Sequence, residues 1–361
     1  MEYRQLGASG TVVSRLALGS MYFGGETSEQ DAFNIIDAYV EAGGNLIDTA
    51  NVYMGGRSEA IVGRWFASRP RDATDRLLLA TKGRHSVHAM PNAAGLSRLG
   101  LNRQLDDSLR NLDRDRIDLY QLHSWDPLTP VEETLRFLES AVRAGKIHYV
   151  GLSNFTGWQL QLFISTAREL GVALPVTLQQ QYSLLSRESE WEVIPCALHN
   201  HIGLLPWSPL AGGFLAAKYR RASVPAPDTR AGSDKPLYQW VSAEIAESDR
   251  NWATIDLVKQ VAERLGKTPS QVSLAWISDR PSVTAPIVGA RTLAQLRENL
   301  AAVDLHLDEE STAALEQVSR PVPGGYPYGE FGTLQRERPK GGANALAAVV
   351  AAGSRHPLGH V

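Results

Sequence analysis

Cysteine is nearly absent from this 361-residue sequence, which contains only Cys196. One thiol excludes an internal disulfide and any zinc site built from several thiolates. Long apolar runs are also lacking, because the longest, residues 345–352, is far shorter than the ~20 residues that span a bilayer. The first residues lack the charged-then-apolar plan of a signal peptide. We therefore expect a cytoplasmic protein that is not bound to a membrane.

Charge of one sign is equally scarce. The formal net charge is −3, which gives no general attraction to nucleic acid or to anionic lipid. Apolar residues make up 43% and charged residues 21% of the chain, as is typical of a soluble globular protein. His85 and His88 lie three residues apart, but no third ligand is evident, so we expect a solvated loop and no metal site.

Short apolar segments alternate with helical patterns along most of the chain. We expect strands at residues 16–19, 45–48, 77–81, 117–122, 148–152, 176–178, 203–207 and 285–288, after a hairpin around residues 7–10. Strands separated by helices pair in parallel. Eight such units predict a closed (β/α)8 TIM barrel. A doubly wound sheet is the alternative, weakened because no Gly-x-Gly-x-x-Gly follows any strand.

Two regions depart from this alternation. Residues 216–248 are polar and show no clear period, which predicts a long functional or mobile loop. Near residue 320 the composition shifts to proline, glycine and basic residues. We therefore expect a barrel domain at 1–320 and a C-terminal tail at 321–361, partly ordered at most. Within the barrel, Ser58 and Ser270 are the expected N-caps of their helices.

Polar or stacking groups follow nearly every predicted strand. In a barrel, chemistry gathers at the C-terminal ends of the strands. The residues at these ends are Gly19, Ser20, Met21, Asp48, Lys82, His123, Ser153, Asn154, Gln179, Trp207, Gly289 and Arg291. Singly, Asp48 could cap a helix, Lys82 could end a strand in solvent and His123 could be a core imidazole. Their recurrence at one rim favours a site.

Asp48, Lys82 and His123 can ionise next to Tyr53, which lies five residues after Asp48. A phenol titrates near ~10, and a neighbouring ammonium stabilises the phenolate and lowers its pKa. Asp48 would keep Lys82 charged and oriented. A tyrosine placed in this way is suited to protonate a carbonyl that becomes an alkoxide.

Other rim residues suit a nicotinamide cofactor. Ser153, Asn154 and Gln179 can hold a carboxamide, and Trp207 offers a flat face. Arg291 and the start of the helix that follows can bind phosphate, which indicates NADP rather than NAD. That helix carries Gln295, Glu298 and Asn299. Tyr22, Phe23 and Trp125 fall where substrate walls would lie, and they serve equally well as packing residues.

The chain resembles the aldo-keto reductases over about residues 1–318. The matching segments are GGNLIDTA (43–50), Tyr53, GRSE (56–59), ATK (80–82), IDLYQLH (117–123), GLSNF (151–155), QQQY (179–182), WSPLAGG (207–213) and PIVGAR (286–291). The pattern is closest to the bacterial and potassium-channel-β-subunit-like branch. Gln181 departs from it, because a glutamate is common there.

The resemblance implies a (β/α)8 barrel that binds extended NADPH and reduces an aldehyde or ketone reversibly. It implies that Asp48, Tyr53, Lys82 and His123 are catalytic, with Tyr53 as the acid, and that Ser208, Leu210, Gly212 and Lys218 lie along the pyrophosphate. Alternatives are a nicotinamide-binding regulatory or interaction subunit with slow chemistry, and a keto-sugar reductase of a biosynthetic pathway. The expected partner is a small carbonyl compound, and a homo-oligomer is compatible with the sequence.

Overall fold

Eight parallel strands form the centre of the fold in the computed structural model, which describes residues 1–227 and 229–336. Their order around the sheet is β10-β3-β4-β5-β6-β7-β8-β9, so consecutive strands are neighbours. The strands are β3 (Ala17–Gly19), β4 (Leu46–Asp48), β5 (Leu78–Gly83), β6 (Ile117–Leu122), β7 (Ile147–Ser153), β8 (Pro175–Gln181), β9 (Gly203–Trp207) and β10 (Ile287–Gly289).

The ring closes between β9 and the segment that precedes β10. Leu204 and Val283 form a parallel bridge. The backbone N–H of Leu204 donates to the carbonyl of Ser282 at 2.8 Å, and the N–H of Thr284 donates to the carbonyl of Leu204 at 2.8 Å. The predicted (β/α)8 barrel is thus confirmed.

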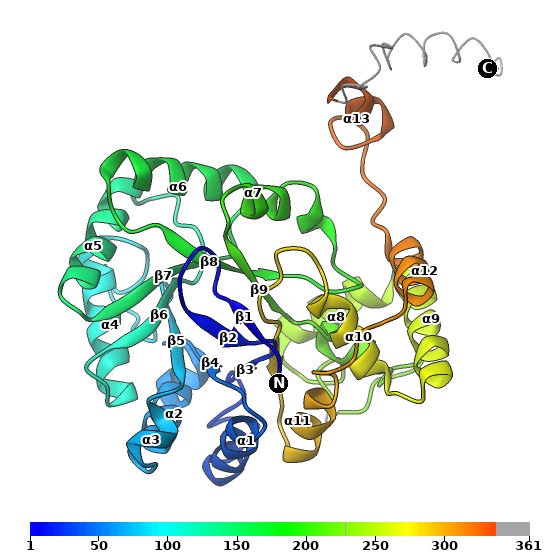
Figure 1. Cartoon of the computed structure of the whole chain (residues 1–361), viewed down its shortest axis with the longest axis horizontal. Helices are drawn as coiled ribbons and strands as arrows, with labels where there is room; N and C mark the ends of the chain where they lie inside the picture. Colours follow the sequence, from blue (N-terminus) through cyan, green and yellow to red (C-terminus); the bar gives the residue numbers. More distant parts are fainter. Residues whose placement is uncertain (228, 337–361) are drawn as a thin grey trace. The chain divides into compact units, whose positions relative to one another are not determined.

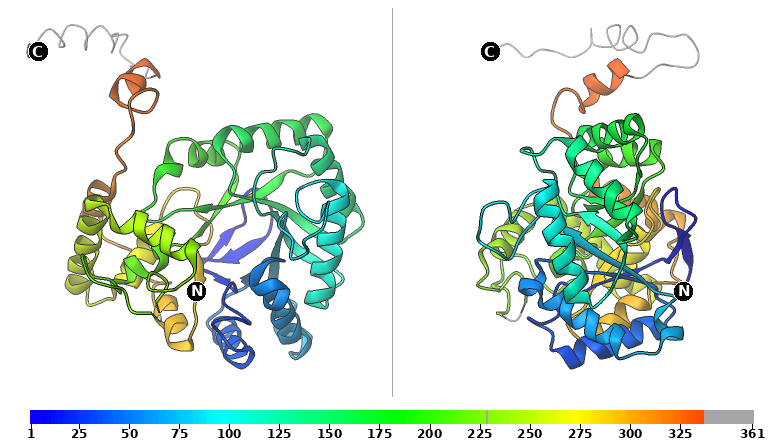
Figure 2. Two further views of the ribbon diagram at one scale, coloured as in Figure 1. Left: turned by 180° about the vertical axis from the view of Figure 1, so that it is seen from behind. Right: turned by 90° about the vertical axis from the view of Figure 1, so that its left-hand side faces the viewer.

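Helices surround the strand ring on its outside, as Figures 1 and 2 show from three sides. They are α1 (Glu29–Glu41), α2 (Arg57–Ala67), α3 (Arg71–Thr74), α4 (Arg98–Leu112), α5 (Val131–Arg143), α6 (Gly157–Leu170), α7 (Val193–His199), α8 (Pro236–Ala246), α9 (Asp249–Leu265), α10 (Pro269–Ser278), α11 (Leu293–Leu300) and α12 (Glu309–Ser319). Three short 3-10 helices are η1 (Tyr53–Gly56), η2 (Glu188–Glu190) and η3 (Ala211–Ala216). None of the described helices has the length and apolar character needed to cross a membrane.

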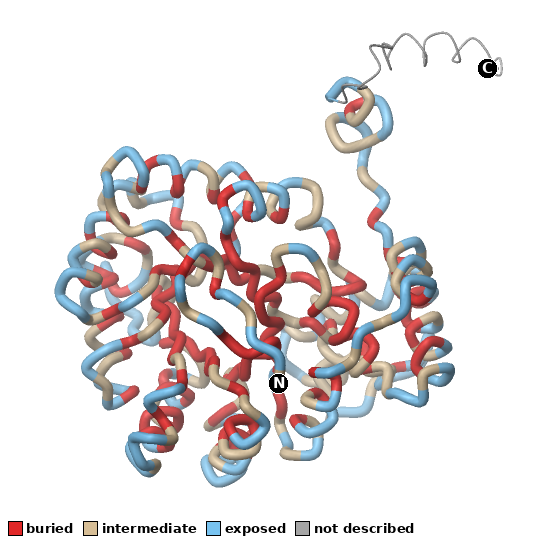
Figure 3. Tube along the Cα trace, in the orientation of Figure 1, coloured by how far each residue is buried: buried red, intermediate tan, exposed pale blue. Residues whose placement is uncertain are grey.

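The two-residue period of the strands separates two cores. Leu46 packs with the cluster inside the barrel, whereas its neighbour Ile47 packs with the cluster between strands and helices. Leu119 and Tyr120 of β6 divide in the same way. The buried strands form the red centre of Figure 3, and exposed residues lie mainly on the outer helices and loops. This alternation directs Asp48 into the barrel, two residues after Leu46.

A hairpin closes the N-terminal end of the barrel. It consists of β1 (Tyr3–Gln5) and β2 (Val12–Ser14), as predicted. Leu6 and Val13 join the apolar cluster inside the barrel. Gly7 has a φ of +56°, and a Cβ there would lie 1.9 Å from the carbonyl oxygen of Val176. Only glycine fits this close approach, so the hairpin packs directly against the backbone of β8.

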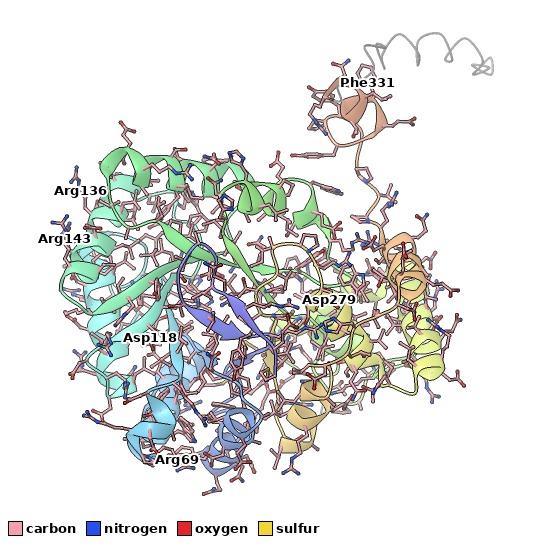
Figure 4. All side chains as sticks on the ribbon, in the orientation of Figure 1. Arg69, Asp118, Arg136, Arg143, Asp279 and Phe331 are labelled. Atoms are coloured by element: carbon pink, nitrogen blue, oxygen red, sulfur yellow. The ribbon has the colours of Figure 1, made fainter. Side chains whose placement is uncertain are left out.

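A buried arginine stabilises the same end. Arg15 is fully buried, and its guanidinium donates to Asp279 Oδ1 at 2.8 Å and to the carbonyl of Leu305 at 3.1 Å. Asp279, labelled in Figure 4, follows the last residue of α10. A buried charge paired in this way avoids the large cost of an isolated ion.

Several local predictions were wrong. The N-caps are Gly56 and Thr268 rather than Ser58 and Ser270. Ser58 is instead buried, and its hydroxyl lies 2.8 Å from that of Ser20 and 2.9 Å from that of Thr49. The segment 216–248 is not wholly irregular, because it contains α8. That helix shows no clear apolar period, because none of its described side chains is buried.

The chain divides into two compact units, Met1–Ser319 and Arg320–Val361. In the second unit the structure describes α13 (Glu330–Arg336), and the Arg336 guanidinium donates to the carbonyl of Pro327 at 2.6 Å. Phe331 is 58% exposed. Residues 337–361 of the predicted tail lie outside the described residues.

Candidate active site

Asp48 and Lys82 form a buried ion pair at the C-terminal ends of β4 and β5. Lys82 Nζ lies 2.5 Å from Asp48 Oδ1, and both side chains are almost completely buried. The ammonium also donates to the carbonyl of Thr49 at 2.8 Å and to Tyr53 Oη at 3.2 Å. One ammonium therefore joins the carboxylate to the phenol that the sequence analysis singled out.

Two glutamines complete the environment of Asp48. Gln121 Nε2 and Gln179 Nε2 each donate to Asp48 Oδ2 at 2.9 Å. Strand register explains the meeting, because Lys82 on β5 lies beside Gln121 on β6. The amide nitrogen of Gln179 is thus committed to Asp48 and only its oxygen is left for a ligand. Gln121 was missed in the sequence analysis, although its inward position two residues before His123 marks it.

Burial and neighbouring charges have opposite effects on the pKa values of Lys82 and Tyr53. Burial alone would lower the pKa of the Lys82 ammonium, but Asp48 and Tyr53 raise it above its ordinary value. Burial raises the pKa of the Tyr53 phenol, and Lys82 only partly opposes this shift. The effect of Lys82 on the Tyr53 pKa was predicted from the sequence, but the larger effect of burial was not. Tyr53 is therefore protonated at neutral pH, as a proton donor must be.

His123 lies beside the phenol. Its ring packs edge to face with Tyr53, with centroids 5.9 Å apart. Burial, followed by the charge of Lys82 and the neighbouring His85 and Arg84, lowers the pKa of the imidazole to about 2. The ring is therefore neutral across the physiological range. Its Nδ1 is buried and has no hydrogen-bond partner among the described residues.

A cavity of about 480 Å³ opens above this group, within the range of ligand pockets in proteins. Most of the predicted site residues line it. They are Gly19, Met21, Tyr22, Asp48, Tyr53, His123, Ser153, Asn154, Gln179, Trp207, Ser208, Leu210, Gly212, Lys218, Gly289, Arg291, Gln295, Glu298 and Asn299. Lys82 lies beneath this surface, fully buried.

Unusual backbone conformations shape one side of the cavity. Asn154 and Ser208 have φ values of +56° and +53°, and Gly212 and Gly213 have +66° and +104°. Asn154 Oδ1 accepts a 3.0 Å hydrogen bond from Trp207 Nε1, which fixes the indole. Left-handed residues at a functional cavity indicate a backbone shaped for a ligand.

The segment that contains α8 contributes a second side. The Arg230 guanidinium lies 5.5 Å from the centre of the Tyr22 ring and 4.6 Å from that of Tyr238, and all three residues line the cavity. Arg230 Nε is buried without a hydrogen-bond partner among the described residues. Lys235 pairs with Glu26 at 2.6 Å. Arg230 and Glu26 were not predicted as site residues, because neither lies directly at the end of a strand.

Three predicted site residues lie elsewhere. The Ser20 hydroxyl donates to the Asp48 carbonyl at 3.0 Å and faces Ser58, so it stabilises the loop from within. Phe23 is fully buried in the core between strands and helices, because its apolar ring packs there. Trp125 packs edge to face on Phe155 and Trp158 and does not line the cavity.

Of the two histidines after Lys82, only His85 departs from the predicted solvated loop. His85 is half-buried, with its ring 5.0 Å from that of His123, whereas His88 is exposed. Within the described residues, no three or more His, Cys, Asp or Glu side chains gather in a way that could hold a metal ion.

A model of the aldo/keto reductase family matches residues 15–320, which includes the whole ring of parallel strands and the cavity. The chain belongs to this family. The resemblance inferred from the sequence motifs is thus confirmed.

Relatives with oxidoreductase names support this membership. The uncharacterized oxidoreductase YrpG of Bacillus subtilis is 38% identical, over 90% of this chain and 98% of that protein. The versiconal hemiacetal acetate reductase of Aspergillus parasiticus is 33% identical, over 88% and 96% of the two chains. A probable voltage-gated potassium channel subunit beta from rice (Oryza sativa subsp. japonica) is 34% identical, over 84% and 92%. These relatives agree with the predicted bacterial and channel-β-subunit-like branch.

Proposed function

We propose that this aldo/keto reductase uses NADPH to reduce an aldehyde or ketone, reversibly, with Tyr53 as the general acid. One observation carries the proposal: Lys82 Nζ joins Asp48 and Tyr53 Oη at the floor of a large cavity. A neutral phenol held by a buried ammonium is suited to donate a proton to an oxygen that gains negative charge.

The lining of the cavity supports a dinucleotide as its ligand. Arg230 Nε is buried and unpartnered among the described residues, as expected for a group that receives an anion. A Cβ at Gly19 would lie 2.7 Å from Ile287 Cγ2, so only glycine fits at this strand end, which lines the cavity. Ser153 and Asn154 would hold the carboxamide, Ser208 to Lys218 the pyrophosphate, and Arg291 with Gln295 a phosphorylated adenosine.

When bound in this cavity, NADPH would supply the hydride that the carbonyl carbon receives. Tyr53 gives its proton to the carbonyl oxygen, and the product is an alcohol. Lys82 stabilises the resulting phenolate, and Asp48 keeps Lys82 charged and in place. Neutral His123 has one ring N–H and can donate it to the same oxygen. In the oxidation direction the phenolate accepts the proton instead.

A regulatory or interaction subunit with slow chemistry is the second candidate. It rests on the named likeness to a channel β subunit, and a keto-sugar reductase would share the mechanism and differ only in substrate. Oxidation of many NADPH molecules per protein molecule, with a panel of aldehydes, ketones and keto-sugars, would favour the reductase. A single slow turnover with tight cofactor binding favours the subunit. Parallel assays with NADH test the cofactor preference.

The substitution Tyr53→Phe tests the acid. It removes the proton donor and keeps the ring, so we expect turnover to fall by about 10³-fold, while the dissociation constant of NADPH changes by less than about twofold. Steady-state NADPH oxidation and quenching of intrinsic fluorescence measure the two quantities.

Tyr149→Phe is the matched control, because its hydroxyl contacts Thr11 at the closed end of the barrel. We expect it to leave turnover unchanged. Wild-type turnover in Tyr53→Phe would refute the role of Tyr53 as the acid.

A further inference from the structure

His85 touches the proposed catalytic group from a loop that the proposed mechanism does not use. Its ring centroid lies 5.0 Å from that of His123, at an interplanar angle of 69°. His123 contacts Tyr53 in turn, at 5.9 Å and 78°. Three rings therefore form a series of edge contacts that ends at the phenol.

The protein holds His85 in one orientation. Asn51, two residues before Tyr53, donates from Nδ2 to the main-chain oxygen of His85 at 2.7 Å. Arg84 Nη1 lies 3.1 Å from His85 Nδ1. A guanidinium can only donate, so Nδ1 is the acceptor and the proton of a neutral His85 is on Nε2. His85 is thus fixed both in position and in tautomer.

Arg84 is itself anchored through its backbone on both sides. Its N–H donates to Gln104 Oε1 at 2.5 Å, and its carbonyl accepts from the N–H of Gly95 at 2.7 Å. Its φ of +124° is a conformation that residues with a Cβ rarely adopt. Such a conformation persists only where the surroundings hold it, and here it directs the Arg84 side chain to His85.

His123 lacks the hydrogen bond that usually orients a catalytic imidazole. Its Nδ1 has no partner among the described residues, so ring contacts must set the ring plane. We propose that His85 positions the His123 ring for proton donation to the substrate, and that Arg84 orients His85. This inference rests on the proposed reductase function, since it assigns His85 to the same reaction.

The surroundings of His123 explain why a second imidazole suits this position. The titratable and charged groups that face its ring are Tyr53 from η1, Lys82 from β5, and Arg84 and His85 from the loop after β5. Two of these are cations and none is a carboxylate. A neutral ring such as His85 fills the space next to His123 without adding a charge.

Hydride transfer in a single turnover tests the proposal. In His85→Ala we expect the rate constant to fall about tenfold, because loss of alignment slows the reaction, and the dissociation constant of NADPH to stay within about twofold. His85→Phe keeps the ring edge and should remain within about threefold of wild type. Arg84→Met should lower the rate constant roughly fivefold, which corresponds to the loss of one hydrogen bond.

His88→Ala is the matched control, because His88 lies on the same loop but is exposed and contacts only Asp107, at 3.6 Å, among the charged groups. It should behave as wild type. A His85→Ala rate equal to that of wild type overturns the proposal, as does a His85→Phe rate as low as that of His85→Ala. An unchanged rate in Arg84→Met overturns the role of Arg84.

Nitrogen NMR of the His123 ring in the cofactor-free protein gives a readout that does not need activity. In wild type the ring should stay neutral between about pH 5 and 8, and in His85→Ala the chemical shifts of its nitrogens should differ from those of wild type, because the ring has lost the contact that sets its plane. If wild type fails to oxidise NADPH with any carbonyl, the proposed function is refuted and the NMR alone decides. Identical His123 signals in wild type and His85→Ala then overturn the positioning role.

Discussion

The two ends of the barrel interior are built from the same strands and have opposite chemistry. At the closed end, Leu46, Ala80 and Leu119 pack with the hairpin residues Leu6 and Val13. Two residues further along the same strands, Asp48, Lys82 and Gln121 form a polar, hydrogen-bonded layer. Because side chains alternate along a strand, each strand contributes one residue to each layer.

The difference shows that the same strands provide stability at one end of the barrel and the proposed chemistry at the other. The apolar layer stabilises the barrel through burial and close packing. The polar layer buries charged and amide groups, and their hydrogen bonds converge on a single ion pair. Substitutions at the two layers should therefore differ: at the closed end they should change stability alone, whereas at the open end they should also change the chemistry.

Lys82→Met should have the largest effect. It removes the cation next to Tyr53 and leaves Asp48 buried without its partner. We expect turnover to fall by about 10³-fold and the free energy of unfolding to fall by about 3–5 kcal/mol. NADPH oxidation and urea unfolding measure these changes.

Lys146→Met is the control for that change, because Lys146 forms an ion pair with Asp106 at 2.7 Å between two exposed side chains. It should alter stability by less than about 1 kcal/mol and leave turnover intact. Equal effects of the two substitutions would contradict the special role of the buried pair.

Leu119→Ala tests the closed end. Removing this fully buried side chain leaves a cavity, so we expect a loss of about 2–5 kcal/mol in the free energy of unfolding. Turnover per folded molecule should stay close to wild type, because Leu119 lies below the polar layer. Leu198→Ala on α7, which is 44% exposed, should change stability little. Loss of turnover in folded Leu119→Ala protein would break the separation between the ends.

The acid dependence of stability should show a smaller effect at the open end. Above about pH 6.5 His123 is neutral in both the folded and unfolded chain, so it contributes nothing. Below that pH the unfolded chain binds a proton that the folded ring, with its pKa lowered to about 2, does not bind. The free energy of unfolding should therefore fall as the pH falls, by up to about 1.4 kcal/mol per unit.

Urea unfolding of His123→Asn between about pH 7 and 5 checks this, and its slope with pH should be shallower than that of wild type. His148→Asn, at an exposed position on β7, should retain the wild-type slope. A slope in His123→Asn that equals the wild-type slope would show that His123 takes up its proton in the folded protein too.

Sequence reasoning predicted the strands well because their signal is local. Most are short apolar segments that alternate with helical patterns, and polar residues near their ends, such as Asp48 and Lys82, are visible in the chain itself. Helix starts were less well predicted: Ser58 has the chemistry of a cap, but its hydroxyl is used by Ser20 and Thr49. The helix α8 was missed because few of its residues are buried, so no period marks it.

The placement of Arg230 and His85 depends on contacts between segments far apart in the chain. Arg230 lies between the rings of Tyr22 and Tyr238. His85 lies against His123, which is 38 residues away in the chain. Neither residue has a spacing or a neighbour in the sequence that indicates its position.

The sequence by itself determined the barrel, the family and the polar residues at the strand ends, because periodicity and short motifs are local properties of a chain. Only the tertiary structure decided which of these residues share hydrogen bonds. It also decided that burial raises the pKa of Tyr53 by more than Lys82 lowers it. The tertiary structure also brought the ring of His85 into contact with that of His123. Distances, dielectric surroundings and competition for one donor arise only when the strands close into a ring.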